Sequence, residues 1–153
     1  MSESSHSSLH SSQSKLFSVV PPADRPEIEF NMSDYQWQHR IALIFAPSEQ
    51  SPLYQQQMEQ WDASEGIQER ELKLVEVLGT GAGAGRFDGQ RISLMSAERL
   101  RQQFGITTED FAVILVGKDG TEKQRSQTLI DPATIFSAID AMPMRQQEMR
   151  DRQ

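Results

Sequence analysis

The pattern of apolar and polar positions predicts three buried strands separated by amphipathic helices. Apolar runs at residues 41–47 (IALIFAP) and 111–117 (FAVILVG) are continuous, which is typical of buried strands. Residues 71–79 (ELKLVEVLG) carry leucines and valines up to a glycine and predict a further strand. Residues 51–64 and 96–105 instead place apolar side chains three and four positions apart, which predicts helices. A third helix is predicted from residue 131 to Pro143, which stops or kinks it.

Capping residues mark the ends of these helices. Ser51 precedes Pro52 and predicts an N-cap followed by proline at the first helical position. Ser96 is predicted to open the second helix, and Gly105 to end it. Asp131 is predicted to cap the third in the same way as Ser51 caps the first.

A polar hairpin follows the third apolar run. Lys118, Asp119 and Gly120 predict a tight turn, because Asp-Gly accepts the positive φ angles that such turns need. The segment 121–127 (TEKQRSQ) then has the charged pattern of a sheet edge. The order β-α-β-α-β-β-α therefore predicts an α/β, thioredoxin-like fold, with a central mixed four-stranded sheet flanked by helices.

The chain has 153 residues, enough for one domain, and its two parts differ in composition. More than half of the first 14 residues are serine, so residues 1–28 are expected to be a disordered tail and linker, and residues 29–153 the folded domain. The first residues lack the charged start and apolar run of a secretory signal, which favours a cytoplasmic location.

Charge and cysteine content exclude several classes of function. The net charge of -7 and the pI near 4.9 argue against binding to nucleic acid or to an anionic membrane. The chain has no cysteine, which excludes thiolate nucleophiles and cysteine-ligated metals. His39 has no second ligand at metal-binding spacing, and His6 and His10 lie in the serine-rich tail, so no metal or cofactor is expected.

The segment with glycines at positions 79, 81, 83 and 85 follows a predicted strand and contains a G-x-G-x-x-A pattern. A dinucleotide loop would open directly into a helix, whereas about ten residues separate these glycines from the next helix signal. The pattern therefore indicates a loop rather than a phosphate site.

Several strings resemble one known family. YQWQHRIALIFAP, ERELKLVEV, FAVILVGKDGTEKQRS and IDAMPMRQQEMR are similar to P-DUDES, a peroxiredoxin-like family of unknown function. The similarity covers residues 33–152. Members occur as stand-alone bacterial proteins and as domains of animal extracellular proteins with sushi repeats, and many are exported. The resemblance implies a thioredoxin-like fold that generally lacks redox cysteines and has no agreed enzymatic activity.

The redox position of a thioredoxin fold lies just after the first buried strand. Residues 46–51 (APSEQS) hold that place here, and the stretch before the third strand, 108–111, contains no proline. Thiol–disulfide exchange needs a thiolate, which a serine hydroxyl does not replace. The sequence therefore excludes a thiol oxidoreductase or peroxidase.

A small-anion site is one alternative at the same place. The N-terminus of the helix presents free N–H groups, and nearby arginines would add charge. The same residues also suit an ordinary N-cap and surface ion pairs, and both interpretations stay open. The residues of this hypothesis are Arg40, Pro47, Ser48, Ser51 and Arg70.

A partner-binding surface on the hairpin and the C-terminal tail is the leading hypothesis. Its cations either protect a sheet edge or form a docking surface for an acidic protein partner. A homodimer through residues 121–126 is a third, structural interpretation. The predicted surface consists of Lys118, Asp119, Lys123, Arg125 and Arg145. The sequence thus favours a non-catalytic interaction domain without naming its ligand.

Overall fold

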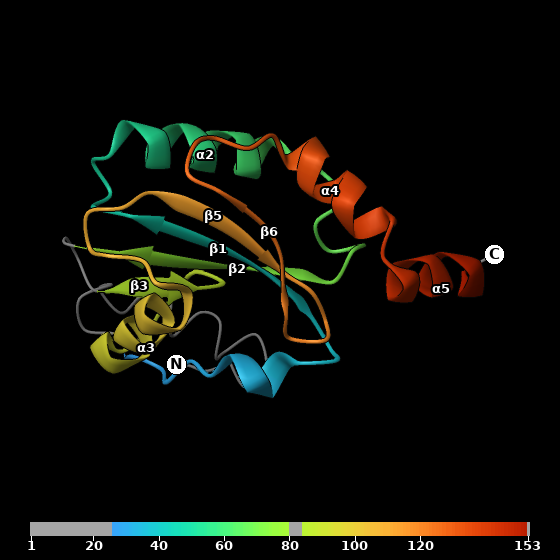
Figure 1. Ribbon diagram of the computed structural model, residues 1–153, viewed down its shortest axis with the longest axis horizontal. Helices are drawn as coiled ribbons and strands as arrows, with labels where there is room; N and C mark the ends of the chain where they lie inside the picture. Colours follow the sequence, from blue (N-terminus) through green and yellow to red (C-terminus); the bar gives the residue numbers. More distant parts are fainter. Residues whose placement is uncertain (1–25, 80–83, 153) are drawn as a thin grey trace, which may run out of the picture.

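The computed structural model describes residues 26–79 and 84–152. The predictions for the serine-rich segment and for glycines 81 and 83 lie outside these residues. Within them, the chain has an α/β fold with a mixed six-stranded sheet in the order β4-β3-β2-β1-β5-β6. Helices cover both faces of this sheet (Figure 1).

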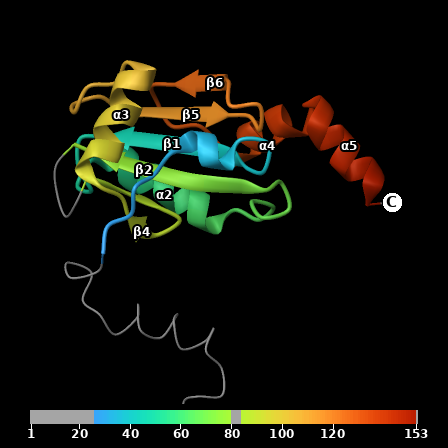
Figure 2. The same ribbon diagram turned by 90° about the horizontal axis from the view of Figure 1, so that it is seen from below.

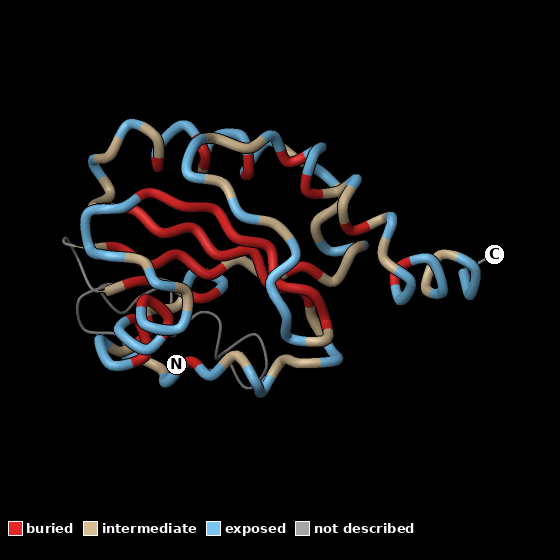
Figure 3. The backbone as a smooth tube through the Cα atoms, viewed as in Figure 1, coloured by how far each residue is buried: buried red, intermediate tan, exposed pale blue. Residues whose placement is uncertain are grey.

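The four predicted strands all form. They are β1 (Arg40–Ala46), β2 (Leu72–Leu78), β5 (Ala112–Val116) and β6 (Glu122–Ser126). β1 pairs with β2 in parallel, whereas β1 with β5 and β5 with β6 are antiparallel pairs. Every residue of β1 is buried, as its continuous apolar run predicts (Figure 3).

Two further strands correct the prediction of a four-stranded sheet. β3 (Gly85–Phe87) pairs with β2, and β4 (Gln90–Arg91) pairs with β3. Asp88 and Gly89 have φ angles of 52° and 84° and turn the chain between these strands. Strands of three and two residues are too short to show an alternating pattern, so the sequence indicated only a loop.

The helices begin close to their predicted residues, with one corrected cap. They are α2 (Pro52–Ala63), α3 (Leu94–Phe104), α4 (Pro132–Asp140), α5 (Pro143–Asp151) and the 3-10 helix η3 (Met32–Tyr35). Ser93, not Ser96, is the N-cap of α3, because its Oγ accepts a hydrogen bond from the Ser96 backbone N–H at 3.1 Å. Gly105 ends α3 in the left-handed conformation with φ 69°, as predicted.

The helices form two layers around the sheet. α2 and α4 cover one face, and η3 and α3 cover the other (Figures 1 and 2). On the second face, the rings of Phe30, Tyr35 and Phe87 pack against one another, with centroids 4.8 to 5.5 Å apart. This aromatic cluster fixes the segment that contains η3 on the sheet.

α5 extends from one end of the molecule, beyond the sheet (Figures 1 and 2). α4 ends at Asp140 and α5 begins at Pro143, and the first position of a helix is one that proline tolerates. Only Arg145 is buried among the residues of α5. Apolar packing is thus not what holds this helix.

Candidate functional site

The structure divides the predicted anion site between the two ends of β1. Pro47, Ser48 and Ser51 follow its carboxyl end, whereas Arg40 is its first residue. β1 has seven residues, so its ends lie about 20 Å apart. Arg40 Nη1 donates to the backbone oxygen of Arg70 at 2.8 Å, which places both arginines at the amino end. They do not reach the N-terminus of α2.

Arg86 of β3, a residue not singled out from the sequence, lies near that helix terminus instead. Its Nη2 donates to Glu49 Oε2 at 3.1 Å, to Tyr54 Oη at 2.9 Å and to Glu76 Oε1 at 3.3 Å. Tyr54 in turn donates to the buried carboxylate of Glu76. A lone glutamate within the apolar run of β2 was the signal that could have revealed this cluster.

The electrostatics of the Arg86 cluster oppose both base catalysis and anion binding. Burial and the hydrogen bond to Glu76 raise the pKa of Tyr54 to about 12, so the phenol stays protonated at neutral pH. Burial alone would lower the pKa of Arg86, but the charge of Glu76 outweighs it and raises that pKa. Two carboxylates face one guanidinium, and the surplus negative charge repels an added anion.

Lys118 and Arg145 of the predicted docking surface are buried in ion pairs. Lys118 Nζ lies 2.6 Å from both Glu71 Oε1 and Glu148 Oε2. Arg145, only 1% exposed, contacts Asp140 at 3.1 Å and Glu69 at 2.8 Å. Neither cation is available to an acidic partner in this conformation.

These pairs belong to a larger ion-pair network at the amino end of β1. Arg40 binds Glu148 through both terminal nitrogens, each 3.2 Å from a carboxylate oxygen. Burial would raise the pKa of Glu148, but hydrogen bonds from Lys118 and Arg40 outweigh it and lower that pKa. The network fastens α5 to the sheet. It consists of Arg40, Arg70, Lys118, Arg145, Glu69, Glu71, Asp140 and Glu148.

The remaining hairpin charges are paired locally. Lys123 contacts Asp119 at 2.9 Å, and Arg125 contacts Glu122 at 2.8 Å. The hydrogen bond from Lys123 is the main cause that lowers the pKa of Asp119 to about 2. The pairing of β6 with β5 also has a register irregularity at Leu115/Val116. Charges and such irregularities discourage pairing of an edge strand with a second chain.

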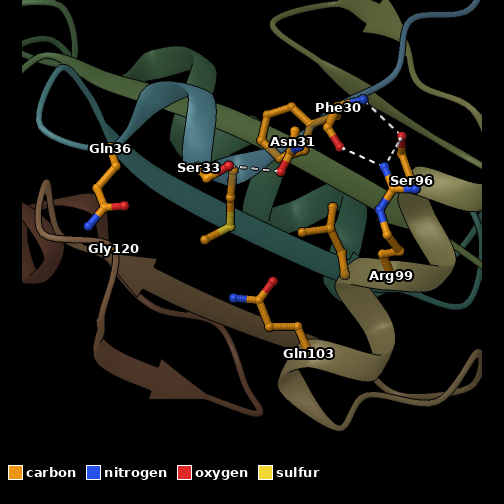
Figure 4. A pocket seen from close by; sticks show the side chains of 10 residues that line it. Phe30, Asn31, Ser33, Gln36, Ser96, Arg99, Gln103 and Gly120 are labelled. Atoms are coloured by element: carbon orange, nitrogen blue, oxygen red, sulfur yellow. Dashed lines mark hydrogen bonds between the residues drawn. The ribbon is translucent and has the colours of Figure 1, made fainter.

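A groove lies between η3, α3 and the turn after β5, and we call it the α3–η3 groove. Its volume is about 280 Å³. Figure 4 shows Gln36 beside Gly120 on one side and Arg99 and Gln103 on α3 across from them. The lining residues are Phe30, Asn31, Met32, Ser33, Gln36, Ser96, Arg99, Leu100, Gln103 and Gly120.

The groove combines an apolar floor with a polar rim. Phe30 and Leu100 are 2% and 3% exposed. Arg99 is the charged residue of the lining, and its side chain is half exposed. Its Nη2 donates to Phe30 O and Ser96 Oγ, both at the long distance of 3.3 Å. Arg99 is therefore held loosely.

Two large apolar side chains next to lining residues in the sequence are exposed. Trp37, next to Gln36, is 60% exposed, and Met95 is 68% exposed. Met95, Arg99 and Gln103 are four residues apart along α3 and share one face of it. Trp37 also has φ 71°, a conformation that bulky residues rarely adopt. The polar neighbours of Trp37 in YQWQH were the only sequence signal of its exposure.

Residues 26–79 and 84–152 contain neither a cluster of metal ligands nor a helix that could span a membrane. No group of three or more histidine, aspartate or glutamate side chains is placed to hold a metal ion there. None of the helices in that part of the chain is long and apolar enough to cross a membrane.

Comparison with known proteins identifies a family and several relatives. The family model described as Domain of unknown function (DUF4174) matches residues 31–148. The chain is 28% identical over 142 residues to coiled-coil domain-containing protein 80 of Danio rerio, covering 82% of this chain and 16% of that protein.

Two human proteins are similar as well. Sushi repeat-containing protein SRPX is 27% identical over 120 residues, covering 77% of this chain and 26% of the relative. For sushi repeat-containing protein SRPX2 the identity is 27% over 149 residues, covering 91% and 32%. The matched region thus spans only 16% to 32% of the length of these three relatives.

Proposed function

The chain belongs to the DUF4174 family of domains of unknown function, and we propose that it is a non-catalytic binding domain for a segment of a partner protein. The segment binds in the α3–η3 groove. We further propose that the domain has the thioredoxin-like arrangement and belongs to P-DUDES. The first assignment rests on the strand order β2-β1-β5-β6, and the second on strings such as IDAMPMRQQEMR.

The observation that carries the proposal is the contrast between the groove and the charged surfaces. The cations predicted for docking are held by carboxylates of the same chain. The α3–η3 groove instead has a buried apolar floor and a loosely bonded Arg99, and the exposed Trp37 and Met95 adjoin its lining residues in the sequence. Exposed tryptophan and methionine next to a hollow are typical of surfaces that bind proteins.

The residues at and around the redox position of a thioredoxin-like fold support a function without covalent chemistry. The chain has no thiol, and the Tyr54 phenol is kept protonated beside Glu76. The Arg86 guanidinium is bonded to the oxygens of three side chains. These groups stabilise the carboxyl end of the sheet by satisfying one another.

The relatives are consistent with a domain that works by contact. In each of the three, the matched region is one part of a longer protein. A binding domain can be used in chains of different length because it needs only its own surface.

The proposal is tested by selecting peptides from a random peptide library displayed on phage, with the wild-type chain as bait. We expect recovery of related sequences that bind the wild type, and weaker binding to Trp37→Ala and to Met95→Ala. Met144→Ala is the matched control, because Met144 is 39% exposed on the distant helix α5. Selected peptides that bind all three variants as well as the wild type would contradict the proposal.

A further inference from the structure

We propose that the α3–η3 groove selects peptides in which an acidic side chain follows or precedes an apolar one. This inference rests on the proposed function and names the class of partner. It follows from the charge of the lining, from the hydrogen bonding of Arg99 and from the apolar floor of the cavity.

The lining of the groove is positive in an acidic protein. The chain contains 22 aspartate and glutamate residues, yet none of those within residues 26–79 and 84–152 lines the groove. Arg99 supplies its formal charge, and Glu29, the acid that approaches Arg99, is 3.7 Å away with a side chain 69% exposed. A carboxylate that enters the groove therefore meets a cation without a buried competitor.

Arg99 has donors to spare for such a carboxylate. Of the nitrogens of the Arg99 guanidinium, only Nη2 donates to an acceptor within the described residues. Both of its hydrogen bonds are 3.3 Å long. In the ion-pair network, by contrast, Arg145 Nη2 lies 2.8 Å from its carboxylate partner. A guanidinium has five N–H donors in a planar fork, which suits two parallel bonds to one carboxylate.

The rest of the groove suits the remainder of a peptide. Phe30, Met32 and Leu100 offer an apolar floor for one side chain. The amides of Asn31 and Gln103 line the rim and can pair with peptide backbone groups. A volume of about 280 Å³ is at the small end of ligand sites, which usually measure about 300–1,000 Å³.

Contacts outside the cavity favour a peptide over a small acid. Trp37 and Met95 are exposed, and each adjoins a lining residue in the sequence, Gln36 and Ser96 respectively. A small acid bound to Arg99 would leave both uncovered, whereas a chain of several residues covers them.

The probes are three peptides with blocked ends, Gly-Leu-Glu-Leu-Gly and its glutamine and lysine counterparts, together with acetate. Binding to the full wild-type chain is followed through amide and indole signals in NMR titrations. We expect the glutamate peptide to shift the signals of Trp37, Gln103 and Gly120. We also expect its affinity to exceed that of the glutamine peptide at least about tenfold, as a charge-assisted hydrogen bond implies.

Arg99→Ala should remove this preference, and Arg99→Lys should keep only part of it. Arg150→Ala is the matched control, because Arg150 is an exposed arginine of α5 that bonds to Gln147. A dispersed amide spectrum of each variant shows that it is folded.

Equal affinity for the glutamate and glutamine peptides, or binding unchanged in Arg99→Ala, would overturn the acidic preference. Shifts that still lie in the groove would then leave the proposed function standing. Shifts elsewhere on the molecule would overturn both. No response to the glutamate peptide, or the same response to acetate at equal concentration, would overturn the inference that the ligand is an acidic peptide.

Discussion

The ion-pair network at the amino end of β1 and the α3–η3 groove both contain arginine, but the two regions hold it differently. In the network, Arg40 and Arg145 are 0% and 1% exposed, and each contacts at least one carboxylate within 3.2 Å. In the groove, Arg99 is half exposed, its hydrogen bonds are 3.3 Å long, and the carboxylate that approaches it, Glu29, is 3.7 Å away and 69% exposed. A cation that its own chain has neutralised contributes to folding, whereas a loosely held one remains free to bind a ligand.

The difference also explains why α5 stays attached to the domain. The helix buries a single residue, Arg145, so its apolar contribution is small. Arg145 and Glu148 connect it to β1, to the loop before β2 and to the end of β5. Ion pairs thus replace the apolar stripe by which α4 packs against the sheet.

The largest effect is expected when the network loses its central carboxylate. Glu148→Gln leaves Arg40 and Lys118 buried with less compensating charge, and breaking a buried pair in this way costs about 3–5 kcal/mol. Urea unfolding measures this loss. Glu59→Gln, at an exposed position of α2, is the control and should change the unfolding free energy by less than about 0.5 kcal/mol.

Acid should weaken the ion-pair network. The folded chain lowers the pKa values of Glu148 and Asp140, so the folded state binds fewer protons than the unfolded state. The resulting stability is complete above the ordinary carboxylate pKa of about 4 and is lost as the pH falls below it. Melting temperatures between neutral and acid pH measure this loss, and Glu148→Gln should lose less on acidification than the wild type. An equal loss in both would contradict the role of Glu148.

The smallest effect on stability is expected at the groove. Trp37 has φ 71°, which costs a bulky residue about 1–2 kcal/mol, and glycine adopts that angle freely. Trp37→Gly should therefore leave the unfolding free energy within about 1 kcal/mol of the wild type, and above that of Trp37→Ala. Both variants should bind peptide more weakly. A loss of stability in Trp37→Gly larger than in Trp37→Ala would show that the ring supports the fold.

The long apolar runs and some helix ends, such as the cap at Asp131, were predictable because they are local. The apolar pattern predicts β1, β2 and β5 to within a few residues, and Ser51-Pro52 predicts the start of α2. β3 and β4 were not predictable, since their pairing depends on a turn at Asp88-Gly89 and on the distant partner β2. Ser96 was predicted as a cap because the sequence alone does not show which of two serines faces the helix N–H groups.

The site residues were less predictable because their partners are distant in the chain. Lys118 is 30 residues from Glu148, and Arg145 is 76 residues from Glu69, so no spacing pattern revealed that these predicted docking cations are neutralised. Arg99 and Phe30, 69 residues apart, meet only when η3 and α3 pack on the same face of the sheet. The sequence therefore indicated where charge is abundant, but not which charges the fold leaves available.

The most direct test compares Arg99→Ala with Glu148→Gln in two measurements on the same samples, the free energy of unfolding and the affinity for Gly-Leu-Glu-Leu-Gly. We predict that Arg99→Ala keeps its stability within about 0.5 kcal/mol and loses the peptide, and that Glu148→Gln loses stability and keeps the peptide while folded. Loss of peptide affinity in folded Glu148→Gln, with Arg99→Ala unaffected, would contradict the division between a structural network and a binding groove.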